Sequence, residues 1–192
     1  MGMELFFDTM ERLTPQLRAG DLAGCEAAAI AALQALPPSP FHVAADLAVA
    51  NDPVDAARYF DGFYVKAARR RTVRAVYTEL NGFDINPGRW FCDVFGYTTD
   101  GGLDDLDWLS DWQDESADDY TLTGLEPLQA VYAGPAFRDP VARDARLLSN
   151  VVVVTKFQRF VQRAAEHMTA LRVPLYVTAH DYDFVARLVP GG

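Results

Sequence analysis

The sequence has few of the side chains on which catalysis and metal binding usually depend. Its 192 residues include two cysteines, three histidines and four serines. No GxSxG, GxxxxGKS/T, HExxH or CxxC pattern occurs, so the common signatures of hydrolases, P-loop proteins, zinc proteases and thiol-redox proteins are missing. Two lone cysteines, Cys25 and Cys92, do not make a disulfide framework. We therefore expect no metal and no cofactor, and the sequence leans against an enzyme.

Long apolar runs are also missing. No run approaches the roughly 20 residues that are needed to cross a bilayer. The first residues, MGMELFFDTMER, lack the basic start of a secretory signal. We expect no membrane partner and a cytoplasmic protein.

Basic residues are absent from one long stretch. Residues 96–120, GYTTDGGLDDLDWLSDWQDESADDY, hold nine acidic side chains and no basic one. The chain has 27 acidic and 17 basic residues, a net charge of −10, and without these nine acids the net charge would be −1. A nucleic-acid-binding protein needs a stripe of the opposite sign. We therefore expect no nucleic-acid partner.

The acidic stretch does not have the spacing of a calcium loop. Counted from Asp105, Leu109 stands at ligand position 5, Ser110 at the glycine position and Ser116 at the final glutamate position. The leucines and tryptophans of the stretch instead predict a short helical turn that presses apolar side chains onto the body and leaves the aspartates in water. A pair of like charges about 6 Å apart costs roughly 0.7 kcal/mol in bulk water, which a surface tolerates.

Three interpretations of residues 96–120 remain open. The stretch is a solvated insertion, or a docking surface for a basic protein, or it neutralises the chain's own basic cluster in KAARRRTVR, residues 66–74. The docking interpretation assigns partner binding to two tryptophans and four aspartates: Asp104, Asp105, Asp107, Trp108, Asp111 and Trp112.

The order of sequence patterns predicts an α+β fold, with N-terminal helices followed by an antiparallel sheet. The sheet is built on a β-hairpin at about 73–98, where β-branched and aromatic runs flank a turn at Asn86-Pro87-Gly88. A C-terminal helix and a strand in PLYVTAHDYDF, residues 174–184, follow. We expect one domain, 1–192, with 1–70 as a helical subdomain and 96–120 as an acidic insertion.

Capping residues predict several helix starts in this fold. Asp21 can cap a helix, and Ser39-Pro40, Asp52-Pro53 and Asp139-Pro140 each place a side-chain acceptor before a proline. The run VVVV at 151–154 continues the apolar face of the C-terminal helix and is predicted as helix, with Lys156 on the opposite, polar face.

Three polar residues are the candidates for chemistry. His180 follows the last long predicted strand, and Glu79 and Asp93 lie in strands of bulky residues. A carboxylate on a buried face must be paired or must have a raised pKa, and such groups often mark catalytic sites.

Two hypotheses follow. The first is a non-catalytic cytoplasmic interaction protein whose acidic segment docks a basic partner, for example a bacterial immunity protein or inhibitor. The second is a small enzyme or ligand-binding protein with a pocket between the aromatic hairpin and the His180 strand, where Glu79, Asp93 and His180 converge. Homo-oligomerisation through aromatic side chains is compatible with either.

Overall fold

The computed structural model describes residues 3–83 and 85–191, which form two compact units. The first unit contains Met1–Ala50, Gly82–Trp90 and Leu122–Arg159, and the second contains Asn51–Asn81, Phe91–Thr121 and Phe160–Gly192. That they make one folding domain stays a prediction.

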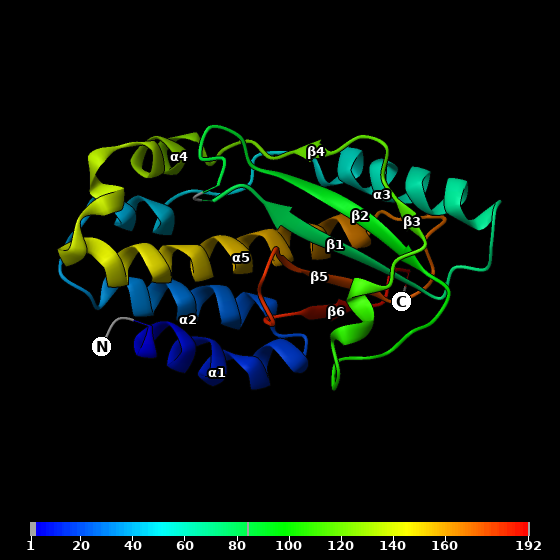
Figure 1. The fold of residues 1–192 in the computed structure, drawn as a ribbon, viewed down its shortest axis with the longest axis horizontal. Helices are drawn as coiled ribbons and strands as arrows, with labels where there is room; N and C mark the ends of the chain where they lie inside the picture. Colours follow the sequence, from blue (N-terminus) through cyan, green and yellow to red (C-terminus); the bar gives the residue numbers. More distant parts are fainter. Residues whose placement is uncertain (1–2, 84, 192) are drawn as a thin grey trace. The chain divides into compact units, whose positions relative to one another are not determined.

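The first unit is helical (Figure 1). Asp21 caps a helix as predicted, since its Oδ1 accepts a 2.9 Å hydrogen bond from the Gly24 amide. None of the described helices is long and apolar enough to cross a membrane. The helices of this unit are α1 (Glu4–Arg18), α2 (Leu22–Gln34), the 3-10 helix η1 (Pro40–Ala45), α4 (Glu126–Ala133), the 3-10 helices η3 (Pro135–Arg138) and η4 (Pro140–Ala142), and most of α5 (Arg143–Ala165).

The predicted helical run at 151–154 is confirmed, because all four valines lie buried within α5. The prediction for Lys156 is wrong. Its side chain is only 6% exposed, and its Nζ donates to the backbone oxygens of Ala45 and Leu47 and lies 3.5 Å from Glu26. Three oxygen partners make burial of the ammonium group tolerable.

The second unit holds a sheet, the helix α3 (Pro53–Ala68), which begins at the predicted Asp52 cap, and the end of α5. The predicted hairpin is confirmed as the antiparallel pair β1 (Ala75–Asn81) and β2 (Phe91–Tyr97). The strand predicted in residues 174–184 is confirmed as the shorter β5 (Leu175–Ala179), which pairs with β1 in parallel. The remaining strands are β3 (Asp114–Glu115), β4 (Tyr120–Thr121) and β6 (Ala186–Leu188).

The strand order is β3-β2-β1-β5-β6, with β4 also paired to β2. All strand pairs except β1–β5 are antiparallel. The protein therefore has an α+β fold with a mixed, mostly antiparallel six-stranded sheet.

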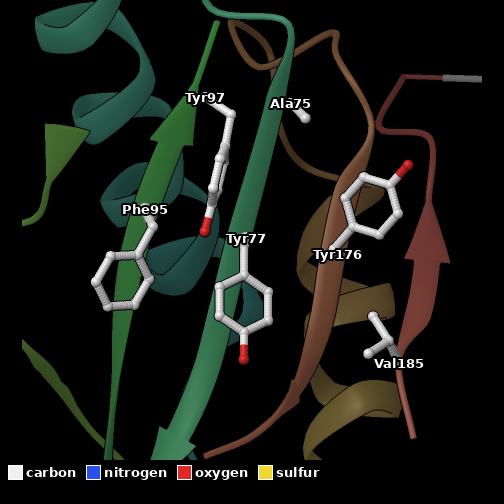
Figure 2. Close-up of a cluster of buried hydrophobic side chains, with 6 residues drawn as sticks. All are labelled: Ala75, Tyr77, Phe95, Tyr97, Tyr176 and Val185. Carbon is white, nitrogen blue, oxygen red and sulfur yellow. The ribbon is translucent and has the colours of Figure 1, made fainter. Parts of the chain in front are cut away.

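The two faces of the sheet have different coverings. On one face, the Phe63 ring of α3 packs so closely on Gly96 that a Cβ there would lie 3.3 Å from the ring. Neighbouring residues of a strand point to opposite faces, so Phe95 and Tyr97 point away from α3. Figure 2 shows the buried cluster on that other face, which we call the aromatic face: Ala75, Tyr77, Phe95, Tyr97, Tyr176 and Val185.

A single carboxylate fastens α3 to the turn before β5. Asp61 accepts hydrogen bonds from the Thr169 amide (2.7 Å), the Thr169 hydroxyl (2.9 Å) and the Leu171 amide (2.9 Å). Partial burial alone would raise the pKa of Asp61, but these hydrogen bonds outweigh it and lower the pKa.

We expect Asp61→Asn to remove a pH-dependent part of the stability. A carboxyl with a folded-state pKa below its unfolded value stabilises the fold fully above the unfolded value, near 3.9, and loses this contribution as the pH falls through the folded value. Asp61→Asn should therefore lower the free energy of unfolding by about 1–3 kcal/mol at pH 7, and the difference from wild type should shrink below about pH 4. Urea denaturation across pH measures it. The exposed Asp8→Asn variant is the control, and a difference that stays constant down to pH 3 would contradict the assignment.

Candidate functional site

Residues 96–120, which we call the acidic segment, cover the aromatic face of the sheet. Four of its side chains pack against the aromatic face and are partly buried there: Leu103, Leu106, Trp108 and Leu109. The predicted short helical turn is confirmed as η2 (Asp107–Ser110). Its leucines and Trp108 therefore act as anchors, and the segment belongs to the packed structure of the sheet.

Trp108 is the central anchor. Its ring makes edge-on contacts with Tyr97 and Tyr176, with centroid distances of 4.8 and 5.1 Å. Its Nε1 donates a 3.1 Å hydrogen bond to the Gly102 carbonyl oxygen. Gly101 lies against the indole, since a Cβ at this position would stand 2.2 Å from Trp108 Cδ1. Residue 101 must therefore lack a side chain for the indole to remain in place.

Polar tethers hold the segment at several further points. The Tyr97 hydroxyl donates to the Leu109 carbonyl oxygen at 2.8 Å, and Gln113 Oε1 accepts from the Thr98 amide at 2.8 Å. The Tyr176 hydroxyl donates to Asp100 at 2.5 Å. Burial and then this hydrogen bond raise the pKa of Tyr176 to about 12, so the phenol keeps its proton at neutral pH.

The outer side of the segment carries the charge. Asp104, Asp105, Asp107 and Asp111 are all exposed. Trp112 is 47% exposed and leans on Phe95, with a centroid distance of 5.3 Å. We call these five residues the acidic surface. The two tryptophans therefore differ: Trp108 points into the fold and Trp112 toward solvent.

Asp114 belongs to a different environment. Its side chain is 3% exposed and forms ion pairs with Arg70 Nη2 at 2.7 Å and with Arg71 Nε at 3.0 Å. The interpretation that the segment neutralises the basic cluster at residues 66–74 thus holds for Asp114. Two cations around one buried acid make a network, which is stronger than an exposed pair.

A second group of polar residues lies at the other end of the aromatic face. Glu79 faces Asp93 across the β1–β2 pair. His180, which directly follows β5, places Nδ1 3.0 Å from Glu79 Oε1, and the Tyr77 hydroxyl donates to Glu79 Oε2 at 2.9 Å. The predicted candidates Glu79 and His180 are therefore in contact, and Asp93 is the cross-strand neighbour of Glu79.

This arrangement can orient an imidazole. Glu79 is 15% exposed in its side chain and His180 is 51% exposed, so the carboxylate lies below and the ring lies at the surface. A carboxylate at Nδ1 favours the tautomer in which Nε2 is the free acceptor. Asp93 accepts a 3.1 Å hydrogen bond from Asn81 Nδ2. Burial, followed by the neighbouring Glu79, raises the pKa of Tyr77 above its ordinary value.

The two cysteines are buried. Burial, followed by the charge of Asp21, raises the pKa of Cys25 to about 11, and burial raises the pKa of Cys92 to about 12. Both cysteines therefore remain neutral thiols. In residues 3–83 and 85–191, no group of three or more His, Cys, Asp or Glu side chains is placed to hold a metal ion.

The sequence reasoning missed a groove of about 570 Å³ between α3 and residues 115–118. A signal for it was present, because Arg58, Lys66 and Arg69 recur at helical spacing along one side of α3. Glu79, Asp93 and His180 do not line this groove. Its lining residues are Arg58, Tyr59, Gly62, Phe63, Lys66, Arg69, Arg70, Glu115, Ser116, Ala117 and Asp118.

No known family model, curated protein or solved structure matches the chain.

We expect Gly101→Ala to loosen the cover of the aromatic face. The added methyl group overlaps the Trp108 ring, so the ring or the segment must move, at about 1–3 kcal/mol of stability. Urea denaturation should show this loss, and tryptophan fluorescence should become more accessible to acrylamide. Gly88→Ala is the matched control, since its Cβ would meet nothing within 4 Å. Equal stability and quenching in the two variants would show that Trp108 is not a tight anchor.

Glu79 should set the tautomer of His180. With the neutral ring, we expect the wild-type proton on Nδ1, because Glu79 accepts from it. Glu79→Gln should shift the population toward the Nε2–H tautomer, since the glutamine amide can donate to Nδ1. Imidazole ¹⁵N NMR distinguishes the two forms. Asp181 Oδ2 lies 3.6 Å from His180 Nε2, on the other side of the ring. The control variant Asp181→Asn should keep the Nδ1–H form. An unchanged tautomer ratio in Glu79→Gln would contradict the orienting role.

Proposed function

We propose that the protein is a non-catalytic interaction module whose acidic surface docks a basic protein. The observation that carries this proposal is the division of one segment into two sides: apolar side chains are buried against the sheet, while Asp104, Asp105, Asp107 and Asp111 face water. Loose solvated loops do not need such anchoring. A fixed cluster of like charges is suited to recognising an arrangement of opposite charges.

Rigidity supports the proposal. A loop that must order itself on binding loses conformational entropy, typically about 0.5–1.5 kcal/mol for each immobilised side chain. Here Trp108, Tyr97 and Tyr176 already hold the backbone under the four aspartates. The acidic surface can therefore meet a partner without reorganisation.

Trp112 is the second support. It is among the few large apolar side chains with almost half of their surface in water, and it lies directly after Asp111. Tryptophan is enriched among residues that contribute most to binding at protein interfaces. An exposed indole that directly follows an aspartate suits a basic partner, because the ring face also attracts cations.

The proposal places the protein in the cytoplasm, where buried unpaired thiols such as Cys25 and Cys92 are usual. An immunity or inhibitor role against a basic toxin or nuclease is one form of it. No nucleic acid or membrane is a partner in this proposal, because the net charge of −10 repels polyanions and anionic lipids.

A second candidate function is favoured by the Glu79–His180 contact. At 3.0 Å, the pair has the orienting geometry of a general base, with Tyr77 holding the other carboxylate oxygen. It would serve a small enzyme or ligand-binding protein. We rank it second because the His180 side chain is 51% exposed and the contact alone indicates no substrate.

Neutralising the acidic surface should weaken partner capture and leave the fold intact. The variant carries Asp104→Asn, Asp105→Asn, Asp107→Asn and Asp111→Asn. We expect at least about a tenfold loss of affinity at low salt, since four exposed charges each contribute a few tenths to 1 kcal/mol. Wild-type binding itself should weaken as salt rises. Quantitative pull-down from lysate across a salt series, followed by binding measurements on the captured protein, tests this.

The matched control has the same change of net charge elsewhere: Glu4→Gln, Asp8→Asn, Glu11→Gln and Glu166→Gln, all at exposed positions. It should bind as wild type does. Trp112→Ala should lose binding, whereas its unfolding curve should stay close to that of wild type. Unchanged capture by the four-asparagine variant would overturn the docking function and leave the Glu79–His180 pair as the better candidate.

A further inference from the structure

The groove beside α3 has an apolar floor and two fixed walls. Tyr59, Gly62 and Phe63 form its floor, and a Cβ at Gly62 would meet nothing within 4 Å, so open space lies above this glycine. The opposite wall, residues 115–118, is held by the Tyr59 hydroxyl, which donates to the Asp118 carbonyl oxygen at 2.8 Å. Ser116 is bound to β2, because Val94 N donates to its Oγ at 3.1 Å.

The walls carry unpaired charges of opposite sign. On the α3 wall, Arg58 is paired with Asp55 at 2.7 Å and Arg70 with Asp114 at 2.7 Å. Among the described residues, no ion pair involves Lys66 or Arg69 on this wall, or Glu115 or Asp118 on the other. Besides the paired Arg58 and Arg70, two positive and two negative charges therefore line the same groove, and no opposite pair of them is within 4 Å.

Simple classes of charged ligand do not match this pattern. A nucleotide or other polyanion would meet Lys66 and Arg69, but it would be repelled by Glu115 and Asp118. A polycation would be attracted by Glu115 and Asp118, but it would be repelled by Lys66 and Arg69. A ligand with one charge of each sign matches both walls, and an apolar group between its charges matches the Tyr59–Phe63 floor.

We propose that this groove binds a short zwitterionic peptide. Its carboxylate lies toward Lys66 and Arg69, its ammonium group lies toward Glu115 and Asp118, and an apolar or aromatic side chain lies over Gly62 between Tyr59 and Phe63. The volume of about 570 Å³ is within the usual range for small-ligand sites, roughly 300–1,000 Å³. This site is separate from the acidic surface and needs no basic protein partner.

The test uses three matched probes: the free dipeptide Ala-Phe, its N-acetyl form without the ammonium charge, and its C-terminal amide without the carboxylate charge. NMR titration of the ¹⁵N-labelled full chain follows the amides of Ser116, Ala117 and Asp118. We expect the free dipeptide to shift these amides with a dissociation constant in the micromolar to low millimolar range. Each blocked form should bind about tenfold more weakly, the loss that follows from about 1.4 kcal/mol per charged contact.

Two pairs of substitutions assign the ends of the ligand. Lys66→Met with Arg69→Met should bind the free dipeptide and its amide equally, because the carboxylate has lost its partners. Glu115→Gln with Asp118→Asn should instead bind the free dipeptide and its N-acetyl form equally. Arg12→Met with Glu11→Gln, on α1, is the control and should keep the wild-type preferences.

Two results would overturn the proposal. One is the absence of any shift in the groove amides with Ala-Phe, Phe-Ala and Phe-Phe at 10 mM. Another is equal binding of the free and both blocked dipeptides to the wild-type protein. The four-asparagine variant of the acidic surface should keep dipeptide binding, so this proposal and the docking function succeed or fail independently.

Discussion

The structure depends on the burial of the aromatic face of the sheet. Tyr77, Phe95, Tyr97 and Tyr176 lie together on that face, and each is at most 8% exposed. The helix α3 does not supply their cover, because it packs on the opposite face at Gly96. The cover comes from the acidic segment, through Trp108 and three leucines. An extremely charged stretch is thus kept in place by the hydrophobic effect acting on its few apolar residues.

Asp114 separates two parts of the acidic segment that have different environments. Before it, the aspartates are exposed and the apolar residues are anchored. At Asp114 the chain enters β3, and the buried carboxylate binds Arg70 and Arg71 at the end of α3. This network fixes the wall of the groove that Glu115 and Asp118 line. Removing one partner of such a network usually leaves an uncompensated buried charge, which costs several kcal/mol. The acidic surface and the groove wall therefore lie on either side of the same ion-pair network in the sequence, although their proposed ligands differ.

Local patterns predicted the elements well, and tertiary contacts explain what they missed. The hairpin was predictable because its β-branched and aromatic runs flank a Pro-Gly turn, and the Asp21 and Asp52 caps act within three residues. The parallel β1–β5 pair joins distant segments, and Glu79 and His180 meet although 101 residues separate them. The contact between Glu79 and His180 depends on the pairing of β1 with β5, which no local pattern predicts. Lys156 was misassigned because helical periodicity takes a lysine as solvent-facing, while the carbonyl oxygens that bury it come from Ala45 and Leu47. Likewise, no pattern distinguishes the anchoring Trp108 from the exposed Trp112.

The charge of the acidic surface is easier to understand as a feature for binding than as one for folding. Four fixed aspartates on one short segment repel one another in the folded protein, at some fraction of a kcal/mol for each close pair. In an unfolded chain the same charges could separate, so the repulsion reduces stability. A basic partner would remove this repulsion on contact, and the energy released would add to the attraction between the two surfaces. The anchoring by Trp108 then has a second consequence, since it prevents the segment from relieving the repulsion by detaching. Under the proposed docking function, a partner with positive charges would therefore meet aspartates that are already held in place.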